Sequence, residues 1–231
     1  MISRLETAQT HHEAYPDIRP SRIRIGLSSS QGDLMTVSKK NTTPRWECRT
    51  FAGNLASLEA RIGLSLQIAA KRSSETYLLN SRTPHGAKLR NGELEIKRLE
   101  RVDPTGLELW NPVFQNGFPL PAPLLQRAFM AFGLPTPMTE RDQYSLDEFL
   151  IEIGRDATFR AVRVEKARRQ FIFGGCMAEL VRIRIGAIAT DSFCVEDENP
   201  QKVLAALREL GLDSRANINF PKALARALEA A

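Results

Sequence analysis

The sequence feature that most constrains the fold is an Asn-Gly pair at positions 91 and 92. Asn91 and Gly92 separate two segments of alternating charged and apolar residues, and both central residues of a type I′ turn need a positive φ. The pair therefore predicts a two-residue β-hairpin. Because side chains alternate along a strand, one face of this hairpin is charged and the other is apolar. The charged face consists of Lys88, Arg90, Glu93, Glu95 and Lys97, and the apolar face of Leu89, Leu94 and Ile96. The charged face either meets solvent or lines a site.

The composition is that of a globular chain without a broad cationic surface. Its 231 residues are 42% hydrophobic and 26% charged, which suits one domain with a sizeable core. The net charge is only +5, whereas a nucleic-acid binder typically carries a strong basic patch. We therefore expect no nucleic-acid partner, and any cationic site must be local.

Cysteine and histidine give no zinc signature, and no segment indicates export or a membrane. Cys48, Cys176 and Cys194 are far apart, and the three histidines are split between positions 11, 12 and 85. The sequence has no apolar run near the length of a membrane span and no signal-peptide core at its start. An odd number of cysteines suits a reducing compartment. We expect a cytoplasmic protein with no membrane partner, and the oligomeric state is left open.

Residues 1–44 differ from the rest of the chain. They mix Ser, Thr, Gln, Pro and charged residues without apolar periodicity, which predicts a flexible N-terminal segment. Met35 is a candidate for the true start. The folded domain is expected to occupy residues 45–231.

Alternation and breaker residues predict the order of the elements in this domain. Strands are expected at 45–51, 75–79, 87–90, 93–97, 107–110, 159–167, 169–173, 178–185 and 188–196. Helices are expected from an N-cap at Asn54 to Ile62, at 124–132, from a capping box at Ser145 to Ile153, at 200–210 and from Pro221 onward. Strands, a helical pair, more strands and C-terminal helices follow one another without βαβ alternation. This order predicts an antiparallel α+β fold.

The later strands carry many charges, and alternation alone leaves two interpretations open. The charged residues are Arg160, Arg163, Glu165, Lys166, Arg168, Arg169, Glu179, Arg182, Arg184, Asp191 and Glu196. In an open antiparallel sheet, such residues form a solvated outer face. In a closed sheet, charged faces converge on a lumen, while Val162, Val164, Leu180 and Val195 pack outward under the helices.

Several short motifs between residues 45 and 228 occur in an order found in one known family. The stretch from Arg45 to Phe51 contains Glu47 and Arg49 at alternating positions. Further stretches are Tyr77 in the second strand, Lys88-Leu89-Arg90, Lys97, Lys166-Ala167-Arg168, Glu179 and Cys194-Val195-Glu196. This succession resembles the CYTH, or triphosphate tunnel, family, whose first strand carries Glu-x-Glu-x-Lys and whose later strands carry paired basic residues and then acidic ones.

The resemblance implies an eight-stranded antiparallel β-tunnel, a barrel-like sheet with flanking helices, that binds tri- or polyphosphate. The phosphate-binding residues that it implies are Arg49, Lys88, Arg90, Lys97, Lys166 and Arg168. The metal ligands that it implies, for Mg²⁺ or Mn²⁺, are Glu47 and Glu196, with Glu95 and Glu179 as candidate catalytic or compensating acids. The residue types suit this chemistry, because Arg and Lys bind phosphate oxygens and hard divalent cations prefer carboxylates.

Two departures from the family pattern leave the function open. Arg45 and Cys194 stand where the family has acids, so two expected oxygen ligands are missing and a cation is added beside the metal position. The first hypothesis is a metal-dependent phosphohydrolase, such as an inorganic triphosphatase, acting on a phosphorylated small molecule or polyphosphate. The alternatives are a non-catalytic polyphosphate- or polyanion-binding module that lost its metal site, and a structural interaction domain whose helices at 124–132 and 146–153 dock a partner. The substrate is not identified by the sequence.

Overall fold

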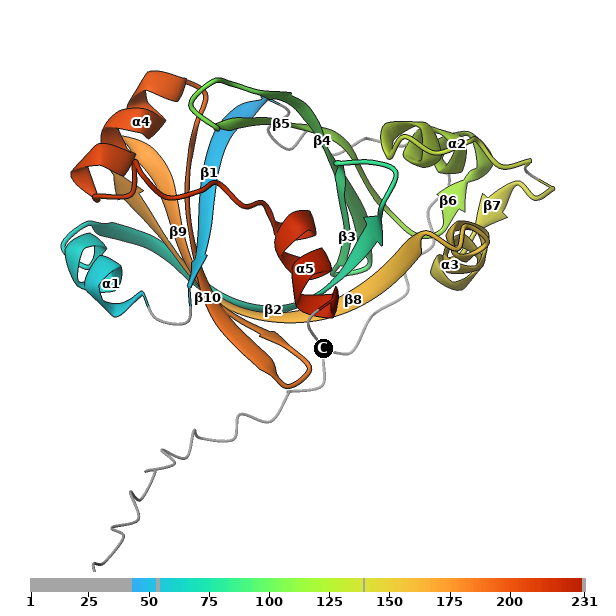
Figure 1. Cartoon of the computed structure of the whole chain (residues 1–231). Helices are drawn as coiled ribbons and strands as arrows, with labels where there is room; N and C mark the ends of the chain where they lie inside the picture. Colours follow the sequence, from blue (N-terminus) through green and yellow to red (C-terminus); the bar gives the residue numbers. More distant parts are fainter. Residues whose placement is uncertain (1–42, 53–54, 139, 230–231) are drawn as a thin grey trace, which may run out of the picture. The chain divides into compact units, whose positions relative to one another are not determined.

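The computed structural model describes residues 43–52, 55–138 and 140–229. Within them, eight strands close into an antiparallel barrel in the order β1-β10-β9-β8-β2-β3-β4-β5, seen almost along its axis in Figure 1. These strands are β1 (Arg45–Ala52), β2 (Leu66–Asn80), β3 (Gly86–Arg90), β4 (Glu93–Val102), β5 (Glu108–Gly117), β8 (Phe159–Phe173), β9 (Cys176–Ile185) and β10 (Ile188–Asp197). The predicted α+β fold with an eight-stranded antiparallel tunnel is confirmed. The N-cap predicted at Asn54 and almost all of residues 1–44 lie outside the described residues.

The hairpin at Asn91-Gly92 has the predicted register. Both residues have positive φ, 53° and 76°, and Arg90 pairs with Glu93, as Lys88 does with Glu95. The register aligns Lys88 and Arg90 of β3 with Glu95 and Glu93 of β4 on one face.

Several strands, among them β2 and β8, are longer than the sequence predicted. β2 begins at Leu66 rather than at residue 75, because its first half pairs with the end of β8, from Leu66 opposite Ile172 onward. β8 is one strand of 15 residues instead of two. Both extensions come from pairing between segments about a hundred residues apart, which local alternation does not reveal.

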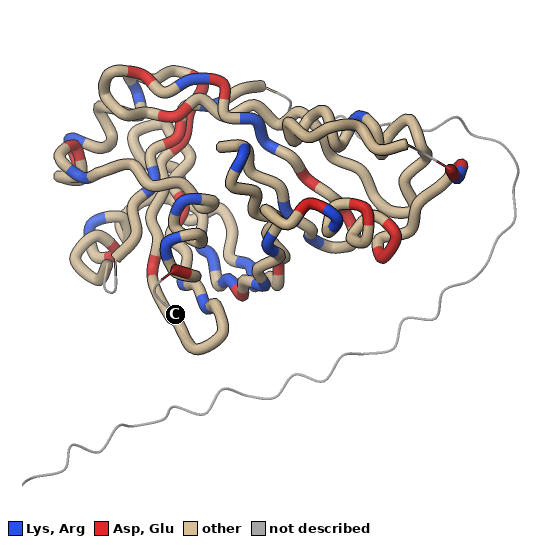
Figure 2. Tube along the Cα trace, turned by 45° about the vertical axis from the view of Figure 1, so that its right-hand side comes forward, with Lys and Arg blue, Asp and Glu red and all other residues tan. Residues whose placement is uncertain are grey.

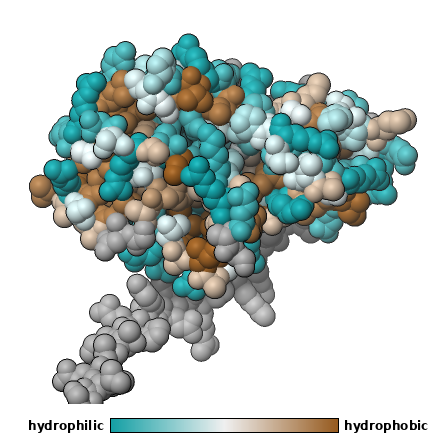
Figure 3. All heavy atoms as spheres, in the orientation of Figure 1, coloured by the Kyte–Doolittle hydropathy of each residue, from teal (hydrophilic) through white to brown (hydrophobic). Residues whose placement is uncertain are grey.

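Helices cover the outside of the barrel in two groups. α1 (Ala56–Ile62) and α4 (Pro200–Glu209) pack with the outward side chains of β1, β9 and β10, including Leu180 and Val195. α2 (Ala122–Ala131) and α3 (Leu146–Gly154) lie beside a two-stranded sheet of β6 (Leu120–Pro121) and β7 (Gln143–Tyr144), and pack with the outward residues of β3 and β4. The predicted capping box at Ser145 is confirmed. In the face shown in Figure 3, hydrophobic and hydrophilic residues are interspersed. No helix within the described residues is long and apolar enough to cross a membrane.

One half of the barrel lumen is filled by apolar side chains. α5 (Phe220–Glu229) lies within the ring of strands in Figure 1 and places Phe220 and Leu224 in contact with inward residues of the barrel. Those inward residues include Val162 and Val164, so the prediction that these two valines pack outward is wrong. They share the inward face of β8 with Lys166 because residues two apart point the same way. The inward face of β8 is apolar at the end of the lumen that α5 fills, and it is charged at the other end.

We expect Leu224→Ala to lower the free energy of unfolding by about 2–5 kcal/mol, since it leaves a cavity in this apolar filling. Leu224 is 1% exposed, whereas Leu228 on the same helix is 43% exposed. Leu228→Ala is the matched control and should change stability by no more than about 0.5 kcal/mol. Urea unfolding of both variants measures the difference. Equal small losses would show that α5 does not stabilise the barrel.

Candidate functional site

The other half of the lumen is a charged cavity of about 250 Å³. All ten site residues predicted from the sequence line it: Glu47, Arg49, Lys88, Arg90, Glu95, Lys97, Lys166, Arg168, Glu179 and Glu196. Four charged residues of the hairpin, Lys88, Arg90, Glu95 and Lys97, are among them, so this part of its charged face lines a cavity. Their individual roles stay predictions.

The two interpretations of the charged strands apply to opposite faces of the same sheet. Alternate residues of β8 and β9, such as Arg163, Glu165 and Arg182, lie on the outside and are exposed, while Lys166, Arg168 and Glu179 line the cavity. Figure 2 shows cationic and anionic residues interspersed along the barrel strands. Some of the charged residues on these strands therefore face the solvent, and others face the lumen.

The centre of the charged half is Glu75, a residue that the sequence analysis did not select. It is 1% exposed, and four cations surround its carboxylate. Lys166 Nζ lies 3.1 Å from Oε2 and Arg168 Nη2 lies 2.7 Å from Oε1. Arg90 Nη1 and Lys88 Nζ are further away, at 3.5 and 3.8 Å. Burial on its own would raise the pKa of Glu75, but the attraction of Lys166, Lys88 and Arg168 holds it far below its ordinary value.

A signal for Glu75 was present in the sequence. Tyr77 was one of the residues that carried the resemblance, and side chains two apart on a strand share a face. Tyr77 lies opposite Lys88 in the sheet, so Glu75 falls two residues along on the same inward face. The predicted strand began at Glu75, but the sequence analysis gave this residue no role.

Lys166 is the most deeply buried cation of the cavity. Its Nζ donates a 2.6 Å hydrogen bond to Tyr77 Oη and lies 3.6 Å from the ring centre of Phe220. Burial lowers the pKa of Lys166 to about 7, because the attraction of Glu75 does not offset burial together with the repulsion of Lys88, Arg49 and Arg168. One carboxylate cannot fully compensate the cations gathered around it.

This shift has a defined effect on stability. The pKa of Lys166 in the folded protein lies below its ordinary value of 10.5, so the folded state holds fewer protons than the unfolded state between these two pH values. Below about pH 7, Lys166 is charged in the folded protein, and the burial of this charge lowers the free energy of unfolding by its full amount. As the pH rises from about 7 towards 10.5, the folded protein releases this proton and the free energy of unfolding increases.

Arg49 organises a second group of charges on the opposite wall. Its Nε donates to Glu47 Oε1 at 3.0 Å, its Nη1 donates to Ser192 Oγ at 2.9 Å, and its Nη2 lies 3.5 Å from Glu179 Oε1. Burial opposes ionisation of Glu47, but Arg49 and Lys97 outweigh it and hold the pKa of Glu47 below its ordinary value. Glu47 is therefore ionised at neutral pH.

The cations of the cavity differ in their solvent exposure. The exposed fraction of the side chain rises from 2% for Lys166 to 22% for Arg90. Arg90 donates twice to Glu95 Oε1, at 3.0 Å from Nε and 2.5 Å from Nη2. Lys97 is exposed and, among the described residues, takes part in no ion pair. Lys97 is the cation most available to a ligand.

The metal half of the site is weaker than the resemblance implies. Glu47 and Glu196 lie directly opposite each other on β1 and β10, but Glu47 binds Arg49, and Glu196 Oε1 lies 3.3 Å from Arg45 Nη1. In the described part of the chain, no group of three or more His, Cys, Asp or Glu side chains is arranged to hold a metal ion. These residues do not fit an ion held by the protein alone, and Arg45 is the added cation that the sequence comparison anticipated.

No protein-family model matches the chain, and no curated protein matches it. Solved structures that it resembles include a conserved hypothetical protein from Pyrococcus furiosus, at 15% identity and a TM-score of 0.45 over 77% of this chain and 98% of that one. A putative adenylate cyclase from Bacillus halodurans matches at 9% identity and a TM-score of 0.46, over 80% of this chain and 98% of that one. A putative adenylyl cyclase from Hippeastrum, described as having a dominant triphosphatase activity, matches at 12% identity and a TM-score of 0.41, over 73% and 88%. The fold assignment rests on the strand pairing of the chain itself, which confirms the expected likeness to tunnel proteins at the level of a closed eight-stranded barrel.

We expect Glu75→Gln to lower the free energy of unfolding by about 3–5 kcal/mol, because it leaves buried cations without their shared counter-charge. Glu59→Gln is the matched control, since Glu59 pairs with Arg169 on the surface and such pairs contribute about 0–1 kcal/mol. Denaturant unfolding of both variants gives the comparison. A loss for Glu75→Gln no larger than that of the control would contradict a central role for this carboxylate.

Proposed function

We propose that the lumen cavity binds tri- or polyphosphate, or a small molecule that carries such a chain. The observation that carries this proposal is the excess of cations in the cavity wall, six against four carboxylates, together with the lack of an ion pair at Lys97 among the described residues. Even with Glu75 beneath them, the cations outnumber the carboxylates. An anion is the partner that completes this charge arrangement.

The proposed ligand suits the donors and the size of the cavity. Arg offers planar, bidentate donors for phosphate oxygens, and Lys offers a compact charge. The Nε of Arg168 is buried without a hydrogen-bond partner and lies 3.6 Å from Glu179 Oε2, so the wall retains unused donor capacity. The volume of about 250 Å³ is below the roughly 300–1,000 Å³ typical of sites for larger organic ligands, which favours a small, highly charged group.

A second candidate function is hydrolysis of the bound phosphate with Mg²⁺ or Mn²⁺, as in an inorganic triphosphatase. The observation that favours it is the position of Glu47 directly opposite Glu196 beside the phosphate-binding cations. Two carboxylates leave most of the coordination of such an ion to phosphate oxygens and water. We assign no reaction step to a metal, since the described residues do not hold one by themselves.

The third hypothesis, a structural interaction domain, has less support. The apolar faces of α2 and α3 are buried, with Leu125, Phe129, Phe149 and Ile153 inside one core cluster. A partner would have to bind other surfaces of these helices.

We expect the wild type to bind tripolyphosphate in EDTA at low salt, and Lys97→Ala to weaken this binding by about tenfold or more, as loss of a charge-assisted contact predicts. Calorimetric titration measures both affinities. Arg163→Ala is the matched control, because Arg163 is an exposed cation on the outer face of the same barrel, and it should leave the affinity unchanged. No binding in EDTA would show that the proposed function is wrong.

Phosphate release from the same ligand separates the two candidate functions. If the site is a triphosphatase, the wild type releases phosphate with Mn²⁺ or Mg²⁺, and Glu47→Gln abolishes release while retaining affinity in EDTA. Binding without release under either metal would leave the binding module as the function. Undiminished release by Glu47→Gln would contradict the role of Glu47.

A further inference from the structure

We propose that this cavity admits polyphosphate end-first and therefore recognises the terminus of a linear chain rather than its interior. The inference rests on the proposed function and adds a substrate class to it. It follows from how α5 closes one end of the lumen, from what holds α5 in place, and from the order of the cations between floor and mouth.

The floor of the cavity consists of Phe220 and Pro221 at the start of α5. Behind Phe220, the lumen is filled by side chains that are at most 1% exposed, namely Val164, Val181, Ile183 and Leu224. The ring of Phe220 stacks on Tyr77 with 5.3 Å between ring centres, and Phe51 meets its edge at the same distance. A phosphate chain has no passage through this packing, because it would have to replace buried apolar contacts with charge.

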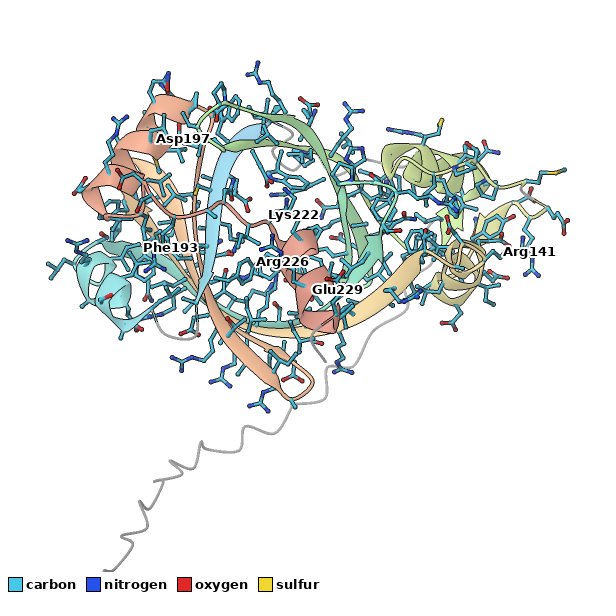
Figure 4. All side chains as sticks on the ribbon, in the orientation of Figure 1. Arg141, Phe193, Asp197, Lys222, Arg226 and Glu229 are labelled. Atoms are coloured by element: carbon cyan, nitrogen blue, oxygen red, sulfur yellow. The ribbon has the colours of Figure 1, made fainter. Side chains whose placement is uncertain are left out.

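Polar contacts of α5 and of the segment just before it fix the helix in this position. Asn219 Nδ2 donates to both oxygens of Glu108, at 2.8 and 3.0 Å, and Lys222 Nζ lies 3.1 Å from Glu108 Oε1. Asn217 accepts from the backbone N–H of Arg49 at 2.8 Å and donates to the carbonyl of Glu47 at 3.0 Å. Figure 4 shows Lys222 and Arg226 on α5 within the ring of strands. The floor is thus tied to β1, the strand that carries two of the site residues.

The cations follow the depth of the cavity. Phe220 contacts the two deepest, with Lys166 Nζ 3.6 Å and Arg49 Cζ 4.6 Å from its ring centre. Gly86, at the start of β3, lies beside Pro221, whereas Arg90, at the other end of this strand, is 22% exposed and lies toward the mouth. Only the last phosphate of a chain reaches Lys166 and Arg49, and the following units meet the cations nearer the mouth. An interior unit would have to enter as a loop of doubled chain, for which a cavity of about 250 Å³ has little room.

The test measures how many protein molecules bind one polyphosphate chain. Linear polyphosphates of two defined lengths, both much longer than the cavity, are titrated in EDTA at low salt, and the stoichiometry is measured by calorimetry. End-first binding predicts no more than two protein molecules per chain at both lengths. A stoichiometry that rises with chain length would overturn the inference.

A polyphosphate with both terminal phosphates blocked by phosphoramidate links to a bulky amine gives a second readout. We expect blocking to weaken binding by at least about tenfold, and equal affinity for free and blocked chains would overturn the inference. Phe220→Ala removes the ring that forms the floor and should reduce the difference in affinity between free and blocked chains. Arg226→Ala, on the exposed side of α5, is the control and should leave this difference unchanged. Full discrimination by a folded Phe220→Ala would overturn the role of the floor, and the wild-type stoichiometry decides the proposal if this variant does not fold.

The result also separates this inference from the proposed function. Absence of tripolyphosphate binding by the wild type overturns both. If binding depends on Lys97 but the number of protein molecules per chain rises with chain length, only the end-first entry is overturned.

Discussion

The carboxylate of Glu75, buried beneath Lys88, Arg90, Lys166 and Arg168, is the interaction on which the charged half of the barrel depends. Burying several cations in one lumen is unfavourable without a shared counter-charge. Glu75, together with Glu95 and Glu179, offsets most of this charge, but the six cations of the cavity still outnumber its carboxylates. The proposed phosphate ligand would offset the positive charge that remains. Burial, together with the repulsion of Lys88, Arg49 and Arg168, lowers the pKa of Lys166.

The apolar end and the charged end of the lumen meet at Phe220. The apolar filling around Phe220 and Leu224 excludes water from one end, and Phe220 forms the floor on which the deepest cations rest. Exclusion of water strengthens the electrostatic interactions above the floor. The same helix that stabilises the barrel thus sets the depth and the direction of access of the site.

Local patterns in the sequence predicted much of the fold and part of the site. The Asn91-Gly92 turn determined the register of β3 and β4, and with it the common face of Lys88 and Glu95. On β1, β8 and β10, the cations and acids of the site were predicted from the resemblance to the family's motifs. Glu75 lay at the start of a predicted strand, but its role depends on cations of β3 and β8 that only the tertiary structure brings around it. The direction of Val162 and Val164 was also mispredicted, since it depends on α5 entering the lumen, a contact that no local pattern encodes.

The central claim is that the cavity holds an excess of positive charge that an anion relieves, and the titration of Lys166 tests it most directly. NMR of protein with ¹³C-labelled lysine follows the Cε signal of Lys166 against pH, with assignment from Lys166→Arg. The account predicts that the pKa of Lys166 is about 7 in the free protein and rises by at least about one unit when tripolyphosphate binds in EDTA. An ordinary lysine titration in the free protein, or a titration that tripolyphosphate leaves unchanged, would contradict it.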